Sequence, residues 1–173
     1  MITTIEFELN KQSIDKAIRQ LRAYKKRIEK RTDELISVMC QEGERYARVA
    51  LTHIDTGDTL NSIIGYRDGD KGIIQAGGHA IWIEFGTGVK GKQSPHPSSD
   101  WLGKQNWQYA VGKFIRKRPN GLIGWYYPTD EFDENGNPIY AFTQGLESNH
   151  FLFDACVKLE MNFKENAKKV FSK

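Results

Sequence analysis

The sequence predicts an α+β fold in which an antiparallel sheet packs against a long N-terminal helix and a C-terminal helix, with a long loop insertion. Apolar residues near both ends of the chain recur at three- and four-residue intervals, the period of an amphipathic helix. Short apolar stretches separated by turn sequences lie between these ends. Residues 89–148 contain all five prolines and little periodicity, so we expect an insertion within a single domain covering residues 1–173.

The first fifty residues contain two different apolar periods. Apolar residues at positions 5, 7 and 9 alternate with glutamates, which predicts a half-buried strand over residues 2–9. From Ser13, the predicted N-cap, the period becomes helical, and no proline interrupts it before about His53. Three of the eleven seam positions of this long helix are polar, so its stripe is better suited to packing on a sheet than to a coiled coil.

Shorter elements follow the long helix. Residues 59–66 and 72–76 are predicted to be strands of a hairpin, because Asp68-Gly69 between them is a strong turn signal. Residues 79–88 form an apolar stretch ended by a glycine-flanked turn, and periodicity leaves both helix and strand open there. In the insertion we expect a helix over 103–116 and strands at 125–127 and 139–142, joined by the turn sequence 133–137. The last helix is predicted from about Asn149.

Charge is unevenly distributed along the chain. The net charge of +3 is too small to imply a polyanionic partner. Residues 11–48 carry a net charge of +5, residues 90–118 carry +6 and residues 119–157 carry −6, while all other residues together carry −2. These blocks can simply face solvent, neutralise each other within one fold, or attract a neighbouring copy. The third alternative gives a candidate assembly interface, in which bases of the insertion meet its acids: Lys104, Lys113, Arg116, Lys117 and Arg118 with Asp130, Glu131, Asp133 and Glu134.

Several classes of protein are not expected from this composition. No run of 18 apolar residues is present, so we expect no membrane-spanning segment. The first residues lack a basic region and an apolar region, so we expect no secretory signal peptide. Cys40 and Cys156 are far apart in apolar helical contexts, which predicts buried core residues in a reducing cytoplasm rather than a disulfide.

Signs of catalysis are also few. Residues 86–93 match the spacing of a phosphate-binding loop, but Gln93 replaces the Ser or Thr that binds Mg²⁺, and Pro95 and Pro97 oppose the helix that must follow. The four histidines are scattered without metal-ligand spacing, and no nucleophile elbow is present. Asp55 and Asp58 flank a turn, where such residues usually cap backbone N–H groups. We therefore expect no enzymatic activity, no cofactor and no metal site.

Single-stranded nucleic-acid binding is the alternative function. Aromatic residues alternate with basic residues over 101–118, a combination that can stack on bases and neutralise phosphates. The same segment can instead pack its aromatic side chains on the core and direct its bases at an acidic protein. No helix-turn-helix, zinc finger or RNP-type motif is present, so we do not expect nucleic acid to be the partner.

Two signatures carry a resemblance to a known family. Asp55-Thr56-Gly57-Asp58-Thr59-Leu60-Asn61-Ser62-Ile63 and Ala80-Ile81-Trp82-Ile83-Glu84-Phe85-Gly86-Thr87-Gly88 resemble the paired motifs of the HK97 gp10-like neck and tail-completion proteins of tailed bacteriophages. Gly124-Trp125-Tyr126-Tyr127, Thr143-Gln144-Gly145 and the aromatic-rich residues 150–155 add to it, so the similarity runs from the long helix to the C-terminus. Thr59 is an extra residue relative to the first motif.

The resemblance implies structural roles for the motif residues. In this interpretation Asp55 and Thr56 satisfy backbone donors at a turn around Gly57, while Leu60 and Ile63 enter the core. Phe85 and Trp82 anchor the second motif, and the Glu84 carboxylate accepts N–H bonds that fix its turn. The remaining motif residues are Ser62, Ala80, Gly86, Thr87, Gly124, Trp125, Tyr126 and Tyr127.

The resemblance also implies a function. Members of this family have no active site and act through surfaces that assemble into a ring between the portal-side connector and the tail. The expected partners are further copies of the chain and other phage connector and tail proteins. The expected location is the bacterial cytoplasm during assembly and the neck or tail of the virion afterwards.

Overall fold

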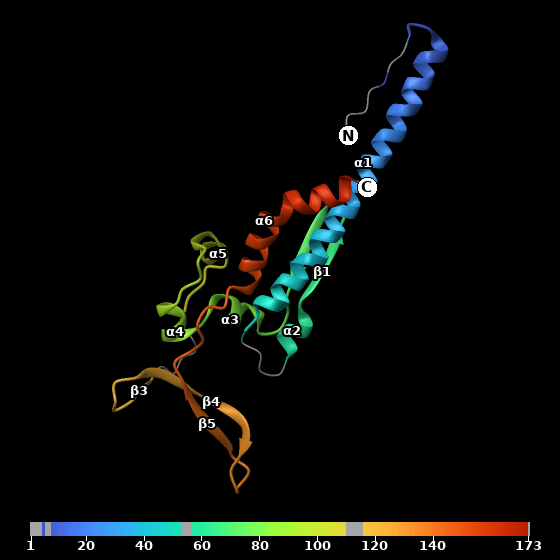
Figure 1. The fold of residues 1–173 in the computed structure, drawn as a ribbon. Coiled ribbons are helices and arrows are strands. Elements are labelled where there is room, and N and C mark those ends of the chain that lie inside the picture. The colour runs from blue at the N-terminus through green and yellow to red at the C-terminus, as the bar shows by residue number, and fades with distance from the viewer. Residues whose placement is uncertain (1–4, 6–7, 53–56, 110–115, 173) are drawn as a thin grey trace.

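The computed structural model describes residues 5, 8–52, 57–109 and 116–172 (Figure 1). Its architecture is α+β, with a long N-terminal helix, antiparallel sheets and a C-terminal helix, as predicted. In chain order the elements are α1 (Lys11–Ala50), α2 (Asp58–Ser62), β1 (Ile64–Asp68), β2 (Lys71–Gln75), α3 (Ala80–Phe85), α4 (Gly88–Gln93), α5 (Ser99–Lys104), β3 (Arg116–Lys117), β4 (Ile123–Phe132), β5 (Pro138–Thr143) and α6 (Phe151–Phe171).

The core lies where the C-terminal half of α1 packs against α6 and the β1–β2 hairpin. Phe151 is fully buried at the first position of α6, between α1 and α3 residues of the same apolar cluster. The cluster consists of Tyr46, Ala47, Leu51, Ile63, Ala80, Ile83, Phe151 and Ala155. The C-terminal half of α1 and the first turns of α6 therefore supply the helical part of this core.

The start of α1 differs from the prediction by three residues. The N-cap is Asn10, whose side-chain oxygen accepts the backbone N–H of Ser13 at 2.9 Å. The Ser13 hydroxyl in turn accepts the N–H of Glu8 at 2.9 Å and so ties the segment before the helix to its first turn. Most of the predicted strand 2–9 lies outside the described residues; Ile5, Glu8 and Leu9 are described and are not in a strand.

The hairpin begins later than predicted, because residues 58–62 form the short helix α2. The Arg48 guanidinium explains this ending: it donates to the carbonyls of Leu60 at 2.8 Å and Ile63 at 2.7 Å and so caps α2 from α1. Glu44 accepts the N–H of Gly65 at 2.8 Å and pairs with Arg48 at 3.1 Å. The two strands then pair from Ile64 with Gln75 to Asp68 with Lys71 around Gly69, as the turn signal predicts.

The helix predicted over 103–116 is only partly confirmed, because the observed helix α5 begins at Ser99 and ends at Lys104. The Ser98 side chain caps α5, which ends at Lys104, and Asn106 adopts a left-handed backbone with φ of 45°. The reversal brings the Trp107 ring to within 5.2 Å of both Trp82 and Phe85, measured between ring centroids. Residues 110–115 lie outside the described residues, and 116–117 belong to strand β3. Tertiary packing of the tryptophan thus replaces the helix that the spacing suggests.

The strands predicted at 125–127 and 139–142 are confirmed and are longer than expected. β4 pairs with β5 from Trp125 opposite Thr143 to Phe132 opposite Pro138, and β3 extends the sheet on the other side of β4. The Asp133 carboxylate accepts the N–H groups of Asn135 and Asn137 at 2.9 and 2.8 Å and holds the turn. The resulting ribbon projects from the body at the end opposite the start of α1 (Figure 1).

The two cysteines have different surroundings. Cys40 is buried in α1, and its thiol donates to the carbonyl of Tyr66 at 3.1 Å. Cys156 lies on the exposed side of α6, so the prediction of a buried position is wrong for this residue. Within the described part of the chain, no helix combines the length and apolar character needed to cross a membrane.

Candidate functional site

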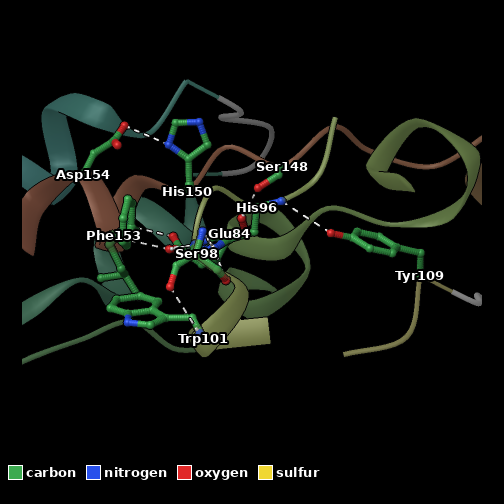
Figure 2. Close-up of polar contacts among 10 residues, drawn as sticks. Glu84, His96, Ser98, Trp101, Tyr109, Ser148, His150, Phe153 and Asp154 are labelled. Carbon is green, nitrogen blue, oxygen red and sulfur yellow. Dashed lines mark hydrogen bonds and ion pairs between the residues drawn. The ribbon is translucent and has the colours of Figure 1, made fainter. Parts of the chain in front are cut away.

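The second family-like motif is built around Glu84, a buried carboxylate at the end of α3 (Figure 2). Its side chain is 2% exposed. Oε2 accepts the N–H of Leu152 at 2.8 Å, and Oε1 accepts the N–H of Phe153 at 3.0 Å. These N–H groups belong to the first turn of α6, where the helix dipole also favours a negative charge. Glu84 therefore caps the last helix from an element 68 residues earlier.

The backbone of Glu84 joins the same helix start. Its carbonyl oxygen accepts the Ser148 hydroxyl at 2.6 Å and the N–H of His150 at 3.1 Å. The neighbouring carbonyl of Ile83 accepts the N–H of Asn149 at 2.9 Å. The chain leading into α6 is thus bonded to α3 residue by residue, which fixes the position at which α6 begins.

His96 provides a further hydrogen-bond partner for the Glu84 carboxylate. Its Nε2 lies 3.1 Å from Oε1 of Glu84, and its Nδ1 lies 3.1 Å from the N–H of Ser98. The tautomer with the proton on Nε2 satisfies both of these bonds, and Nδ1 also lies 3.3 Å from the Ser98 carbonyl oxygen. The imidazole, with no exposed side-chain surface, stacks on Trp101 at 5.6 Å and meets the edge of Phe153 at 5.2 Å.

This acid and base pair is arranged to hold the fold together. Each hydrogen-bonding position of the His96 ring has a protein partner, and both carboxylate oxygens of Glu84 accept backbone N–H groups. A general acid or base must reach a substrate proton, and this pair is enclosed by Phe85, Trp101 and Phe153. Among the described residues, no group of three or more His, Cys, Asp or Glu side chains is placed to hold a metal ion.

In the loop with phosphate-binding spacing, residues 86–93, backbone N–H groups donate to carbonyl oxygens of the chain. Gly86 has φ of 73°, and a Cβ there would lie 2.7 Å from the Ser148 nitrogen, so only glycine fits. The Thr87 hydroxyl accepts the N–H of Leu146 at 3.0 Å. The backbone N–H groups of residues 86, 87, 88, 90 and 91 donate to carbonyls of Trp82, Leu146, Tyr109, Gln144 and Thr87. These donors hold residues 144–146, 109 and the loop itself together instead of facing a phosphate.

The first motif lies around α2, and part of it can be placed. Asp55 and Thr56 lie outside the described residues, and Gly57 is the N-cap of α2. Ile63 is fully buried and Leu60 packs against the core, as predicted from the resemblance. The Ser62 hydroxyl accepts the N–H of Gly77 at 2.9 Å and donates to the carbonyl of Thr59 at 2.8 Å. It therefore ties the motif to the segment that leads into α3.

The third motif forms the base of the projecting ribbon. Gly124 is buried, and a Cβ there would clash with the Thr143 carbonyl of the paired strand. Trp125 packs against Gly88, which links the ribbon to the loop after α3. Tyr126 and Tyr127 are exposed. The motif thus anchors the ribbon at one end and leaves aromatic surface on the strand beyond it.

The charged residues of the candidate assembly interface lie at two ends of the insertion. Arg116 and Lys117 are exposed on β3, near the base of the ribbon, whereas the four acids are exposed at its outer end, on β4 and the turn. Arg118 lies over the rings of Phe142 and Tyr126, at 4.2 and 5.5 Å, and supports the ribbon. Lys104 is exposed at the end of α5, and Lys113 lies outside the described residues. None of the described bases forms an ion pair with these acids within one copy.

The aromatic residues considered for nucleic-acid stacking are engaged within the chain. Trp101 stacks on His96, and Trp107 packs against Trp82 and Phe85. The Tyr109 hydroxyl accepts the N–H of His96 at 3.4 Å. Phe114 lies outside the described residues. Three of the four aromatic residues in this segment therefore contribute to packing around the second motif, with Trp82 itself partly exposed.

Sequence reasoning missed the partners of Glu84. It predicted that Glu84 accepts N–H bonds that fix its own turn, and the bonds instead come from α6. His96 and Ser148 were missed altogether, although two prolines flank His96 and restrict its backbone. Comparison of the chain with protein-family models, curated proteins and solved structures finds no match.

Proposed function

We propose that this chain is a non-enzymatic structural component of a tailed phage or prophage, which assembles into a ring at the junction between connector and tail. The observation that carries the proposal is the size of the uncovered surface. The chain exposes 12816 Å², whereas a compact monomer of its mass exposes about 8,600 Å². Two segments, the first half of α1 and the β4–β5 ribbon, project from the body, and most of their residues are exposed (Figure 1).

The buried motif residues support the same function. Glu84, Gly86 and Thr87 bond the ribbon, the loop and α6 into one frame, and their polar atoms are used within the chain. The buried motif residues thus hold the fold together, and the exposed surfaces are left to contact other proteins. Its partners are further copies and other connector and tail proteins, met in the bacterial cytoplasm during assembly and retained in the virion.

Deletion of the gene from the phage or prophage that encodes this chain tests the proposal. We expect DNA-filled heads and separate tails in electron micrographs of the lysate, with joined particles restored by the wild-type chain supplied in trans. Normal numbers of infectious tailed particles after deletion would contradict the proposal. A gene position between the capsid and major tail genes is also expected.

A charge reversal at the ribbon base gives a finer test. Arg116→Glu together with Lys117→Glu changes exposed side chains and is expected to reduce particle joining at least tenfold, a loss of about 1.4 kcal/mol of binding free energy. Arg118 is left intact because it packs on Phe142. Lys164→Glu with Lys168→Glu, two exposed bases of α6, is the control with the same change in charge. Equal particle yields from both variants would exclude the ribbon base as a contact.

A further inference from the structure

The first half of α1 projects beyond the rest of the molecule. The C-terminal end of α6 reaches α1 at Arg31, whose guanidinium donates to the carbonyl of Val170 at 2.8 Å. Residues 11–30, here called the basic arm, extend past that contact as helix for about 30 Å (Figure 1). Ala17 is the one buried residue of the arm.

The basic arm combines positive charge with an apolar stripe. It contains eight Lys or Arg residues and two acids, and only Lys25 and Glu29 form an ion pair within its described residues. Its large apolar residues recur on one side of the helix and are exposed, Leu21 most of all at 54%. They are Ile14, Ile18, Leu21, Tyr24 and Ile28. Such a stripe normally packs against another element, and its own α6 ends before reaching it.

The outer end of the ribbon has the complementary properties. Residues 128–140, here called the acidic tip, contain four acids and no base, and no Lys or Arg occurs anywhere from residue 119 to residue 157. Phe132, at 65% exposed, lies between two pairs of acids, and Ile139 and Tyr140 are exposed on the paired strand. The acidic tip is therefore an apolar surface surrounded by negative charge.

The arm and the tip cannot meet within one copy, because they lie at opposite ends of the molecule (Figure 1). Pairing two arms would place basic residues against basic residues, and pairing two tips would do the same with acids. We infer that the acidic tip of one copy docks on the basic arm of a second copy, with Phe132 and Tyr140 against the stripe around Leu21. Compared with the bases of residues 104–118, the arm offers more positive charge and an adjoining apolar stripe.

This contact deepens the proposed ring and depends on it for its biological setting. Each copy offers one arm and one tip, so the contact is head-to-tail and leaves one of each free at the ends of any short chain of copies. Repetition closes into a ring when the rotation between neighbours allows it. Because the charges are exposed, association is expected to weaken at least tenfold between 50 and 500 mM salt.

Charge exchange between two full-length variants tests the contact. The arm variant carries Arg19→Glu, Arg22→Glu, Lys26→Glu and Lys30→Glu, which changes the net charge of the arm from +6 to −2. The tip variant carries Asp130→Lys, Glu131→Lys and Glu134→Lys, which changes the net charge of the tip from −4 to +2; Asp133 is kept because it holds the turn. All seven side chains are exposed, so circular dichroism is expected to match the wild type. Sedimentation velocity at 50 mM salt should show concentration-dependent oligomers for the wild type and monomers for each variant alone.

The decisive sample is the equimolar mixture of the two variants. The negative arm of the arm variant can then bind the positive tip of the tip variant. The unchanged arm of the tip variant can likewise bind the unchanged tip of the arm variant. Both contacts pair opposite charges, so oligomers are expected to return. A variant that merely misfolded would not be rescued in this way. The Lys164→Glu, Lys168→Glu chain should associate like the wild type.

Three results would overturn the inference: a wild-type chain that stays monomeric at every concentration, oligomers that survive both reversals, and a mixture that remains monomeric. Binding of a single-stranded oligonucleotide that is lost only in the arm variant, without self-association, would assign the arm to nucleic acid instead. None of these results decides the proposed function, which the deletion phenotype tests separately.

Discussion

The junction of α3 with α6 and the two projecting segments use similar residues in opposite ways. At the junction, Glu84 and His96 are buried and every bond they make is to another part of the chain. In the arm and the tip, charged and aromatic side chains of the same kinds are exposed. Residue type alone therefore does not identify a binding surface. The two regions differ in whether these side chains already have hydrogen-bond and packing partners within the chain.

The largest expected difference between the two regions is in the free energy of unfolding after truncation of one aromatic residue in each. Phe151→Ala removes the largest fully buried side chain among the described residues and is expected to lower the free energy of unfolding by about 3–5 kcal/mol. Phe132→Ala, in the acidic tip, should change it by less than about 0.5 kcal/mol. Urea denaturation followed by circular dichroism measures both. Similar losses in the two variants would show that the tip is packed in the monomer.

Thiol reactivity compares a buried residue, Cys40, with an exposed one, Cys156, and needs no substitution. We expect Cys156 to react with a disulfide reagent at least about a hundred times faster than Cys40, which is buried and bonded to Tyr66. Partial burial of its thiol, together with the Glu84 carboxylate, raises the pKa of Cys156, so it should still react more slowly than a free cysteine at neutral pH. Absorbance stopped-flow resolves the two phases. Equal rates would contradict the packing of β1 against α1.

A pair of glycines separates backbone strain from crowding. Gly86 and Gly121 both have positive φ, but a Cβ at Gly86 meets backbone atoms while one at Gly121 meets nothing within 4 Å. Gly121→Ala is expected to cost about 1 kcal/mol from strain alone. Gly86→Ala should cost about 2 kcal/mol more, because it also crowds the start of the segment leading to α6. Equal melting temperatures would mean that this segment moves aside freely.

The smallest expected effect is the pH response of the ribbon turn. Hydrogen bonds from the backbone and side chain of Asn137, with one from Asn135, lower the pKa of Asp133. Their contribution is therefore present above the pKa of an unfolded aspartate, about 3.9, and is lost as the pH falls through the lowered value. An NMR titration should show the Asn135 and Asn137 amides shifting with that carboxyl. Amides of α6 shifting at the same pH would indicate a global transition instead.

The elements that could be predicted from the sequence are those with a regular apolar pattern over many consecutive residues or a clear turn sequence. α1, α6, the hairpin and the β4–β5 strands follow from spacing and turn residues, because their faces repeat over many positions. The helix predicted at 103–116 was only partly confirmed because Trp107 turns back onto Trp82 and Phe85, a contact that local spacing does not encode. Helix α2 was missed because its cap, Arg48, lies on another element.

The candidate site divides in the same manner. The buried position of Ile63 and the glycine requirement at residue 86 were predictable from the motifs. The partners of Glu84 were not, since its bonds reach 12 residues to His96 and 68 residues to Leu152. Segregated charge was visible in the composition of segments, but only the fold separates the arm from the tip in space.

The length of α1 has a hydrodynamic consequence. Forty helical residues span about 60 Å, whereas a compact chain of 173 residues has a radius of gyration of about 16 Å, which corresponds to a sphere about 41 Å in diameter. A single copy must therefore tumble slowly and elute early from a gel-filtration column. Its apparent mass against globular standards will exceed 19.8 kDa even when no second copy is bound. An early elution volume is thus a property of the rod-like helix, and light scattering is the measure of true mass.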